Sequence, residues 1–245
     1  MPLVKKLLRR TSTSLRFRLG LRVAAPELES GNAEEVAKFY SARVTDCDFL
    51  GDPGHYEHPR AKWIVDQVEG GSLLEIGCGN GGMTRLLAPR AASLTAIDVS
   101  APSLEALERL GLGNVTTVRG LLEDFDPSQP FEWIVMSEIL EHLREPDRAI
   151  ARCMPWLAPG GSLLLTTPNG HWESDEHLHE FTLESFAHLV TGVGPESVRT
   201  SYLRDRDGRR RWLVARLVAP ESPPTPDDFH DRSSMARKRR RGRNS

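Results

Sequence analysis

A glycine-rich turn that follows an apolar run is the part of this chain best suited to binding a ligand. The run 72–76 leads into Gly77, Gly79 and Gly82. Glycines lack a Cβ atom, so the backbone can turn tightly and lie against a ligand, and the N-terminus of a following helix favours anionic groups. Asp98 ends the next apolar run, 21 residues after Gly77, where a carboxylate suits the hydroxyls of a ribose. The pattern predicts a site for an adenosine-containing cofactor.

A second group of ionisable side chains lies later in the chain, at Glu138, Glu141 and His142. At helical spacing, Glu138 and Glu141 share one face and His142 lies one turn from Glu138. Two carboxylates and an imidazole that converge beside a cofactor form a candidate site for a divalent cation such as Mg²⁺ or Mn²⁺. His177 or His179 of a later segment would complete its coordination. Two other interpretations stay open: His142 or His177 acts as a general base, or these residues have only a structural role.

The elements that position these residues alternate between strands and helices, which favours an α/β fold with a parallel sheet. Two helices, at 33–41 and 56–68, precede the first strand, and the chain ends in a hairpin of strands 198–203 and 212–218. The remaining predicted strands are 72–76, 94–98, 115–119, 131–136 and 162–166, and the remaining predicted helices are 83–87, 101–110, 146–156 and 183–190.

Three further segments follow the glycine turn in order. They are the run 133–142, which ends in Glu-Ile-Leu-Glu-His, the run 157–161 (Leu-Ala-Pro-Gly-Gly) and the run 163–169 (Leu-Leu-Leu-Thr-Thr-Pro-Asn). The set, which extends over residues 35–218, resembles the class I S-adenosylmethionine (SAM) methyltransferases, and among them the O-methyltransferases of ubiquinone biosynthesis. This resemblance implies a Rossmann-like, doubly wound, mostly parallel seven-stranded sheet with an antiparallel last strand.

The glycines also satisfy the G-x-G-x-x-G pattern of NAD-binding enzymes. Two features favour SAM instead. Glu75 stands two residues before Gly77, and the motif begins about 70 residues into the chain, after helical segments.

The resemblance implies roles for individual cofactor-binding residues. The backbone of Gly77, Cys78 and Gly79 faces the methionine part of SAM, Asp98 accepts hydrogen bonds from the ribose, and Val99 packs on the adenine. Leu121 replaces an acid that relatives often carry after the third strand. Adenine recognition therefore falls to backbone or to neighbouring residues. Further candidates for cofactor binding are Glu75, Leu122, Glu123, Asp124 and Ser137.

Arg60, in a helix before the first strand, is implied as the partner of the cofactor carboxylate, because a guanidinium can bind a carboxylate in a bidentate manner. The alternative is a surface arginine. The Glu-His run resembles a metal site in ubiquinone-type O-methyltransferases and in methyltransferases of the 3′-terminal 2′-hydroxyl of small RNAs. In the RNA enzymes a later histidine is added, for which His177 and His179 are the counterparts here.

Charge divides the chain into an acidic body with two basic ends. The 245 residues have a net charge of −2, yet residues 1–22 hold seven basic side chains and no acidic one, and residues 237–245 hold six basic side chains. We predict a basic extension over 1–32, a methyltransferase domain over 33–219, and a flexible linker with an arginine-rich tail over 220–245. Basic ends of this kind contact anionic membranes or nucleic acid, or are simply solvated.

No apolar run reaches 18 residues, so no membrane span is predicted, and the start lacks the apolar core of a secretory signal. Three scattered cysteines favour a reducing cytoplasm, with peripheral membrane association as a hypothesis. The leading functional prediction is SAM-dependent O-methylation of a small molecule, a lipid-linked intermediate or a sugar. The alternatives are metal-dependent 2′-O-methylation of RNA ribose, and a non-catalytic, partner-binding protein of the same fold.

Overall fold

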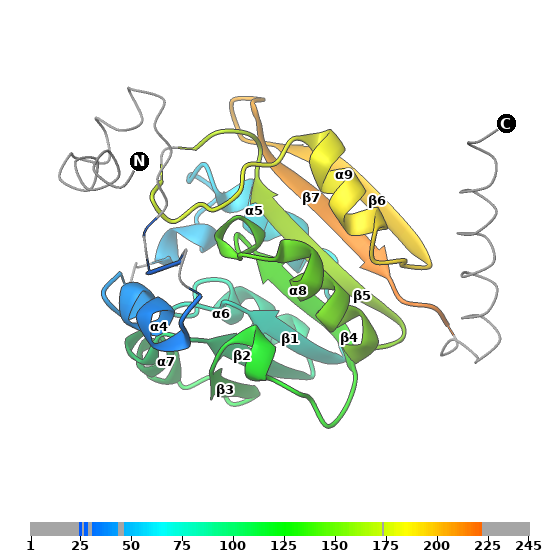
Figure 1. Cartoon of the computed structure of the whole chain (residues 1–245). Helices are drawn as coiled ribbons and strands as arrows, with labels where there is room; N and C mark the ends of the chain where they lie inside the picture. The colour runs from blue at the N-terminus through cyan, green and yellow to red at the C-terminus, as the bar shows by residue number, and fades with distance from the viewer. Residues whose placement is uncertain (1–24, 26, 29–30, 44–46, 173, 222–245) are drawn as a thin grey trace, which may run out of the picture.

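Among the described residues, seven strands form one sheet in the order β3-β2-β1-β4-β5-β7-β6 (Figure 1). The computed structural model describes residues 25, 27–28, 31–43, 47–172 and 174–221, so both basic ends lie outside it. The strands are β1 (Ser72–Ile76), β2 (Ser93–Asp98), β3 (Val115–Arg119), β4 (Phe131–Ser137), β5 (Leu157–Pro168), β6 (Ser197–Arg204) and β7 (Arg210–Val218).

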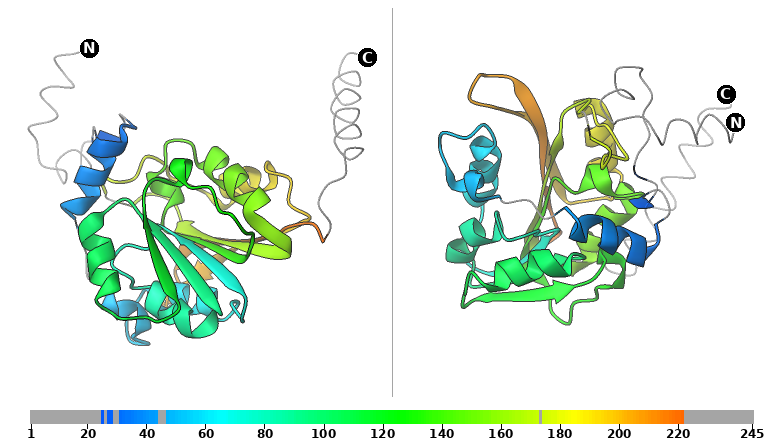
Figure 2. Two further views of the ribbon diagram at one scale, coloured as in Figure 1. Left: turned by 90° about the horizontal axis from the view of Figure 1, so that it is seen from below. Right: turned by 90° about the vertical axis from the view of Figure 1, so that its left-hand side faces the viewer.

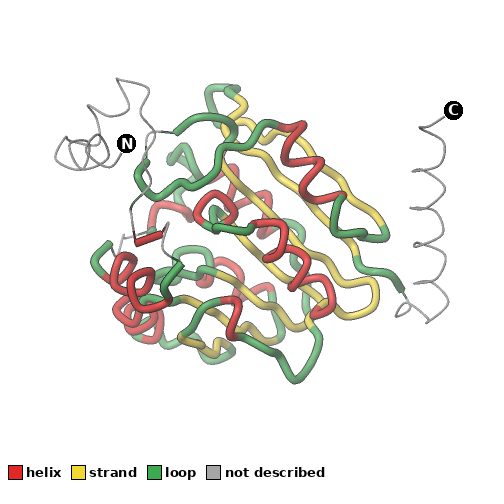
Figure 3. Tube along the Cα trace, in the orientation of Figure 1, coloured by secondary structure: helices red, strands yellow, loops and turns green. Residues whose placement is uncertain are grey.

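Helices alternate with the strands along the chain (Figure 3). The α-helices are α4 (Ala33–Ser41), α5 (His58–Val65), α6 (Thr84–Leu87), α7 (Ala101–Glu108), α8 (Pro146–Cys153) and α9 (Leu183–Thr191). Short 3-10 helices are η1 (Asp48–Gly51), η2 (Ala88–Arg90), η3 (Leu122–Asp124), η4 (Leu140–His142) and η5 (Met154–Trp156).

The predicted fold class is confirmed by the strand pairing. β1 pairs in parallel with β2 and β4, and the parallel arrangement continues to β3 and β5. β7 inserts between β5 and β6 and is antiparallel to both. The sheet is therefore Rossmann-like and mostly parallel, with an antiparallel last strand.

Both faces of the sheet are covered by helices, as the edge-on view shows (Figure 2). Strand β4 demonstrates the alternation, because successive side chains of a strand point to opposite faces. Ile134 and Met136 pack in the hydrophobic cluster that includes Ile150 of α8 and Phe186 of α9. Val135 packs in the other cluster, with side chains of α5, α6 and α7. The sheet is thus doubly wound, as expected.

Three predicted elements differ most from the structure, and proline, glycine and strand pairing account for the differences. The helix predicted over 56–68 covers only His58–Val65, because Gly70 and Gly71, with φ of 63° and 72°, turn the chain into β1. The helix predicted over 146–156 ends at Cys153, because Pro155 has no N–H to continue it. Strand β5 begins at Leu157 instead of residue 162, since Leu157 already pairs with Phe131 of β4.

A third, smaller hydrophobic cluster joins α4 to the carboxyl edge of the sheet. Ala25, Leu28 and Phe39 are buried together, with Tyr40 and Leu178 packed against them. The backbone N–H of Ala25 donates to the carbonyl of Asp175 at 2.8 Å. Residues 25 and 28, which the domain prediction placed in the N-terminal extension, thus pack against α4. No helix in the described part of the chain has the length and apolarity to cross a membrane.

Truncation of Phe186 tests the larger core. Phe186 of α9 is fully buried among the side chains of α8 and β7, so Phe186→Ala should lower the free energy of unfolding by roughly 3–5 kcal/mol, through lost transfer free energy and the cavity left behind. Urea denaturation measures this loss. On the exposed face of the same helix, His188→Ala should change it by less than about 0.5 kcal/mol, and equal losses in the two variants would contradict the packing described.

Candidate active site

A cavity of about 630 Å³ opens at the carboxyl edge of the parallel strands, where ligands bind in open α/β sheets. Its walls come from the glycine turn after β1, the end of β2, η3, the segment after β4, and the helices α4 and α5. Ten of the eleven candidates for cofactor binding line it, among them Arg60, Glu75, Gly77, Cys78, Gly79, Asp98, Val99, Leu122 and Ser137. Glu123 lines it as well, whereas Asp124 is outside its lining.

The glycine turn is shaped by positive φ angles and by one carboxylate. Gly77 has a φ of 72°, and a Cβ atom there would lie 1.9 Å from Cδ1 of Ile139. The N–H of Gly79 donates to Oδ2 of Asp98 at 2.8 Å, and the N–H of Ser100 donates to Oδ1 at 2.8 Å. Asp98 therefore ties the turn to the end of β2. Burial raises the pKa of this carboxyl, and the two N–H donors oppose that rise.

Arg60 reaches the cavity from α5 and is only 5% exposed. Its Nη1 donates to Oγ of Ser137 at 2.5 Å, and its Nη2 donates to a carboxylate oxygen of Glu57 at 2.5 Å. The remaining donor, Nε, is buried and has no hydrogen-bond partner among the described residues. The guanidinium is thus a buried wall of the cavity, and the alternative of a surface arginine is wrong.

Glu75 lies in the floor of the same cavity, buried to 3% exposure. Its Oε2 accepts a hydrogen bond from Oγ1 of Thr84, at the start of α6, at 2.7 Å. Among the described residues no basic side chain compensates the carboxylate, and burial raises the pKa of Glu75 to about 8, against the opposing effect of the Thr84 hydroxyl.

The helical spacing predicted for residues 138–142 is wrong. Glu138 has a φ of 56°, in the left-handed region, and only Leu140–His142 form a short 3-10 helix. Backbone strain of this kind, at a residue other than glycine, occurs mainly at functional sites. The turn sends the Glu138 carboxylate to Thr166, whose Oγ1 donates to it at 2.9 Å. Glu138 lines the cavity, but it is not part of the cluster that Glu141 and His142 form.

Glu141, His142 and His177 do come together. One potential ligand atom from each lies within 4.8 Å of those of the other two. The loop after β5 brings His177 there, because the N–H of Leu178 donates to the backbone carbonyl of Glu141 at 2.6 Å. His179, the other histidine candidate, instead stacks on Phe181 and faces the carbonyl of Arg144.

The hydrogen bonds of this cluster indicate which ring nitrogen of His142 carries the proton. The carbonyl of Glu176 lies 3.0 Å from Nδ1 of His142 and can only accept, so Nδ1 carries the proton. Nε2, 3.7 Å from Oε1 of Glu141, then presents a lone pair. Burial lowers the pKa of His142 and keeps it neutral, despite the opposing Glu176 carbonyl. The Nε2 lone pair can bind a cation or accept a proton.

Glu141 is the acidic member of the cluster and is almost fully buried. Its Oε2 accepts from Oγ1 of Thr167 at 2.9 Å, whereas Oε1 has no hydrogen-bond partner among the described residues. Burial raises the pKa of this carboxyl to about 7.

Tyr40 is a cavity residue that the sequence-based prediction missed. It lies on α4, lines the cavity, and meets the ring of His142 edge-on at 6.1 Å between centroids. A weak signal was present, because Val36, Phe39 and Tyr40 form an apolar stripe at helical spacing. That stripe identifies the buried face of α4, but not what the face covers.

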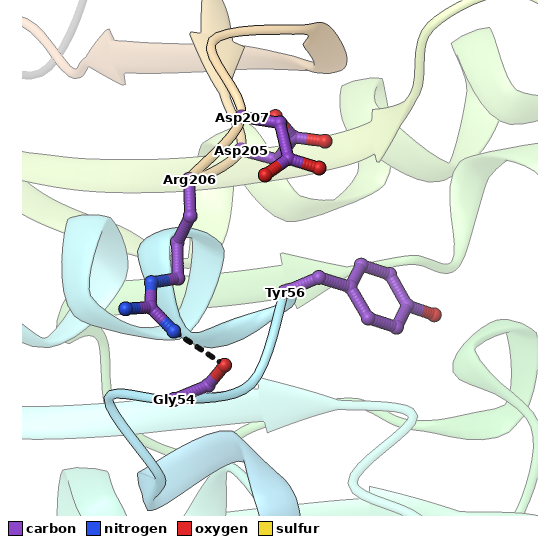
Figure 4. A pocket seen from close by; sticks show the side chains of 5 residues that line it. All are labelled: Gly54, Tyr56, Asp205, Arg206 and Asp207. Carbon is purple, nitrogen blue, oxygen red and sulfur yellow. Dashed lines mark hydrogen bonds between the residues drawn. The ribbon is translucent and has the colours of Figure 1, made fainter.

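A second cavity, of about 390 Å³, lies between the β6–β7 turn and the segment before α5 (Figure 4). Nη1 of Arg206 bridges its two sides with a hydrogen bond of 2.6 Å to the carbonyl of Gly54. Asp205, in the wall of this cavity, accepts hydrogen bonds from Nε of Arg211 and from the backbone N–H of Arg209. These contacts hold the hairpin turn in place, and none of the predicted site residues lines this cavity.

Comparison with known proteins agrees with this geometry. A family model described as a methyltransferase domain matches residues 54–204, which is more than half of the 245 residues. The chain therefore belongs to the methyltransferase-domain family. It is a SAM-dependent methyltransferase, as the resemblance of the ordered segments from the glycine turn to residue 169 predicted.

Individual relatives agree with this assignment. Ubiquinone biosynthesis O-methyltransferase of Saccharophagus degradans is 34% identical over 148 residues, which cover 56% of this chain and 63% of that protein, slightly less than two thirds of its length. The protein of the same name from Coxiella burnetii is 28% identical over 182 residues, covering 71% and 72% of the two chains. The N-methyltransferase NodS of Bradyrhizobium japonicum, solved with S-adenosylhomocysteine (SAH), has the same fold, with a TM-score of 0.61, 23% identity and coverage of 76% and 98%.

The raised pKa of Glu75 predicts a pH-dependent stability. As pH rises above the ordinary value of 4.5, the unfolded chain loses this proton while the folded chain keeps it until about pH 8. The folded state therefore loses stability across this window, by roughly 1.4 kcal/mol for each pH unit. Glu75→Gln keeps an acceptor for Thr84 and removes this loss, so the variant should gain stability over the wild type from pH 5 to pH 8.

Urea denaturation at the two pH values measures the difference. Glu132→Gln is the matched control, because hydrogen bonds from Ser72 lower the pKa of Glu132 and its titration ends below this window. Its effect should be the same at pH 5 and pH 8. Parallel pH profiles for the wild type and Glu75→Gln would mean that Glu75 is ionised in the folded chain.

Proposed function

We propose that this methyltransferase transfers the methyl group of SAM to an oxygen atom of a small-molecule acceptor. The observation that carries the proposal is the cluster of Glu141, His142 and His177 beside the cavity that all the cofactor-binding candidates except Asp124 line. An oxygen nucleophile must lose its proton or have its pKa lowered, and a cation site or a neutral imidazole can serve that need. The O-methyltransferase names of the relatives support the same choice.

The cavity fits SAM group by group. We assign the ribose hydroxyls to Asp98, the methionine part to the backbone of Gly77, Cys78 and Gly79, and the adenine to Val99 and Leu122. The buried Nε of Arg60, which has no partner among the described residues, suits the cofactor carboxylate. Ser137 holds Arg60 in place, and Glu75 supports the first turn of α6 behind the glycine turn. When bound, SAM supplies an electrophilic methyl group on a sulfonium.

We further propose that Glu141, His142 and His177 hold a divalent cation. Two features fit. Oε1 of Glu141 is buried with no partner among the described residues, and Nδ1 of His142 donates to a backbone carbonyl, as the second nitrogen of a metal-binding histidine usually does. With Glu138 turned toward Thr166, two of the three donors are imidazoles, which favours Mn²⁺ over Mg²⁺. A cation there would act as a Lewis acid on the acceptor oxygen.

The reaction type is tested by the release of SAH from SAM with a panel of acceptors. The panel contains catechol, simple phenols, a sugar and a short RNA, with primary and secondary amines of similar size as controls. Release with an oxygen acceptor above the amine controls is expected. Transfer to amines alone would contradict the proposed O-methylation and leave the SAM-binding assignment standing.

Replacement of Asp98 tests the cofactor assignment. Asp98→Ala removes the ribose acceptor and releases the N–H of Gly79, so SAH affinity should fall by roughly 1–3 kcal/mol, and the melting temperature should fall as well. Asp124→Ala removes the same charge from an exposed residue outside the cavity lining and should change neither quantity. Calorimetric titration with SAH and with NAD measures binding. Binding of NAD without SAH would refute the assignment.

Removal of metal tests the proposed cation site. EDTA should abolish turnover, Mn²⁺ should restore it, and SAH affinity should not change. Titration of the apo protein with Mn²⁺ alone gives a second readout: Glu141→Gln should lose Mn²⁺ binding, whereas Glu184→Gln on the exposed face of α9 should keep it. If EDTA leaves turnover intact while His142→Ala abolishes it, the cation is excluded and the imidazole is the base.

A further inference from the structure

The hydroxyl of Tyr40 is buried without a hydrogen-bond partner among the described residues. An unpaired buried hydroxyl costs folding free energy, and phenylalanine at this position would keep the same ring contacts. These contacts are edge-on to Phe39 at 5.2 Å and to His142 at 6.1 Å between ring centroids. Packing of α4 therefore explains the ring of Tyr40 but not its oxygen.

Tyr40 lies between the two functional halves of the site. Its ring meets the ring of His142, in the Glu-His cluster, at 6.1 Å between centroids. It lines the same cavity as Gly77 and Asp98. A group held beside Tyr40 would thus be close to both the cofactor and the proposed cation site.

Apolar side chains form part of the cavity that Tyr40 lines. Leu28, Val36, Ile139 and Leu143 contribute to its lining. In small-molecule sites a few placed polar groups among apolar walls fix the orientation of the ligand. Among these neighbours, Tyr40 supplies a hydroxyl that can give direction.

Contacts from one distant segment, the loop after β5, hold α4 over the cavity. Arg43, just after the helix, pairs with Asp175 at 3.4 Å and with Glu176 at 3.5 Å, and its guanidinium lies 3.6 Å from the centre of the Phe39 ring. Leu178 of the same loop packs in the cluster with Phe39. The loop that carries His177 and the helix that carries Tyr40 therefore meet, and both side chains lie beside the ring of His142.

We propose that Tyr40 is an acceptor-binding residue, whose hydroxyl donates a hydrogen bond to the acceptor oxygen that receives the methyl group. The inference rests on the proposed O-methylation and adds a residue to it. A phenol keeps its proton at neutral pH, so Tyr40 acts as a donor and takes no proton from the acceptor. The acceptor proton leaves through the Glu-His cluster, and Tyr40 fixes the direction in which the oxygen lone pair points.

The test is Tyr40→Phe in the full chain, with three measurements. The first is kcat/KM for the oxygen acceptor of the panel with the highest turnover, at saturating SAM, which should fall about tenfold or more, the loss expected for one hydrogen bond. SAH affinity should stay within about twofold. The melting temperature should stay equal or rise, because the variant removes a buried unpaired hydroxyl.

Tyr202→Phe is the matched control. Tyr202 lies on β6 under Arg210 and outside the cavity lining, so its variant should keep wild-type turnover. Unchanged turnover in Tyr40→Phe would overturn the proposal and leave the hydroxyl without a role in the reaction. Loss of SAH affinity with unchanged kcat at saturating SAM would overturn it in favour of the cofactor. If the wild-type chain binds SAH but methylates no oxygen acceptor, the proposed function fails first, and the Tyr40 assignment falls with it.

Discussion

The parallel pairing of β1 with β2 and β4 is the constraint on which the site depends. The register aligns Ile76 with Ile97 on one side and with Met136 on the other. Gly77, which follows β1, therefore lies at the same level as Asp98 and Ser137, the last residues of β2 and β4. A one-residue change of register would turn the side chains of a strand to the opposite face and expose its core residues. Burial of the core side chains therefore fixes the register. The register in turn sets the distances between Gly77, Asp98 and Ser137, which lie 21 and 39 residues apart along the chain.

The site concentrates polar groups that destabilise the fold. Glu75 and Arg60 are buried, Glu141 carries an unpaired oxygen, and Glu138 adopts a left-handed backbone. Burial of an isolated charge is unfavourable in free energy, and the raised pKa values of Glu75 and Glu141 are a consequence of this. The two large hydrophobic clusters on either side of the sheet supply the compensating stability. The carboxyl edge is thus the part of the molecule in which stability is reduced in favour of ligand binding.

The fold alone does not choose the acceptor atom. NodS, an N-methyltransferase, shares this fold at 23% identity, whereas the relatives from Saccharophagus degradans and Coxiella burnetii carry the name of an O-methyltransferase. The groups that distinguish acceptors lie where the segment after β4, the loop after β5 and α4 meet. His142, His177 and Tyr40 come from these three segments, and they are the residues on which the proposed reaction and its acceptor depend.

The sequence by itself determined the class of fold and the cofactor half of the site. Alternating apolar runs, the glycine turn and Asp98 are local features of the sequence. Their positions depend only on the formation of the sheet and not on contacts between distant loops. Ten of the eleven cofactor-binding candidates line one cavity for this reason, although their individual roles stay predictions. For Arg60 the sequence left a surface position open, because neither its burial nor its bonds to Glu57 and Ser137 could be read from spacing.

Only the tertiary structure decided the acceptor half. Helical spacing predicted that Glu138 joins Glu141, and this was wrong, because the chain leaves β4 through a left-handed residue. His177 and His179 were equivalent candidates until hydrogen bonds from Leu178 and His179 to the carbonyl of Glu141 set the path of the loop. Tyr40 lies about 100 residues before His142 along the chain, and the small cluster around Phe39 brings them together. The spacing of apolar residues indicates which face of a helix or strand is buried. Contacts between distant segments depend instead on tertiary packing, which no local pattern encodes.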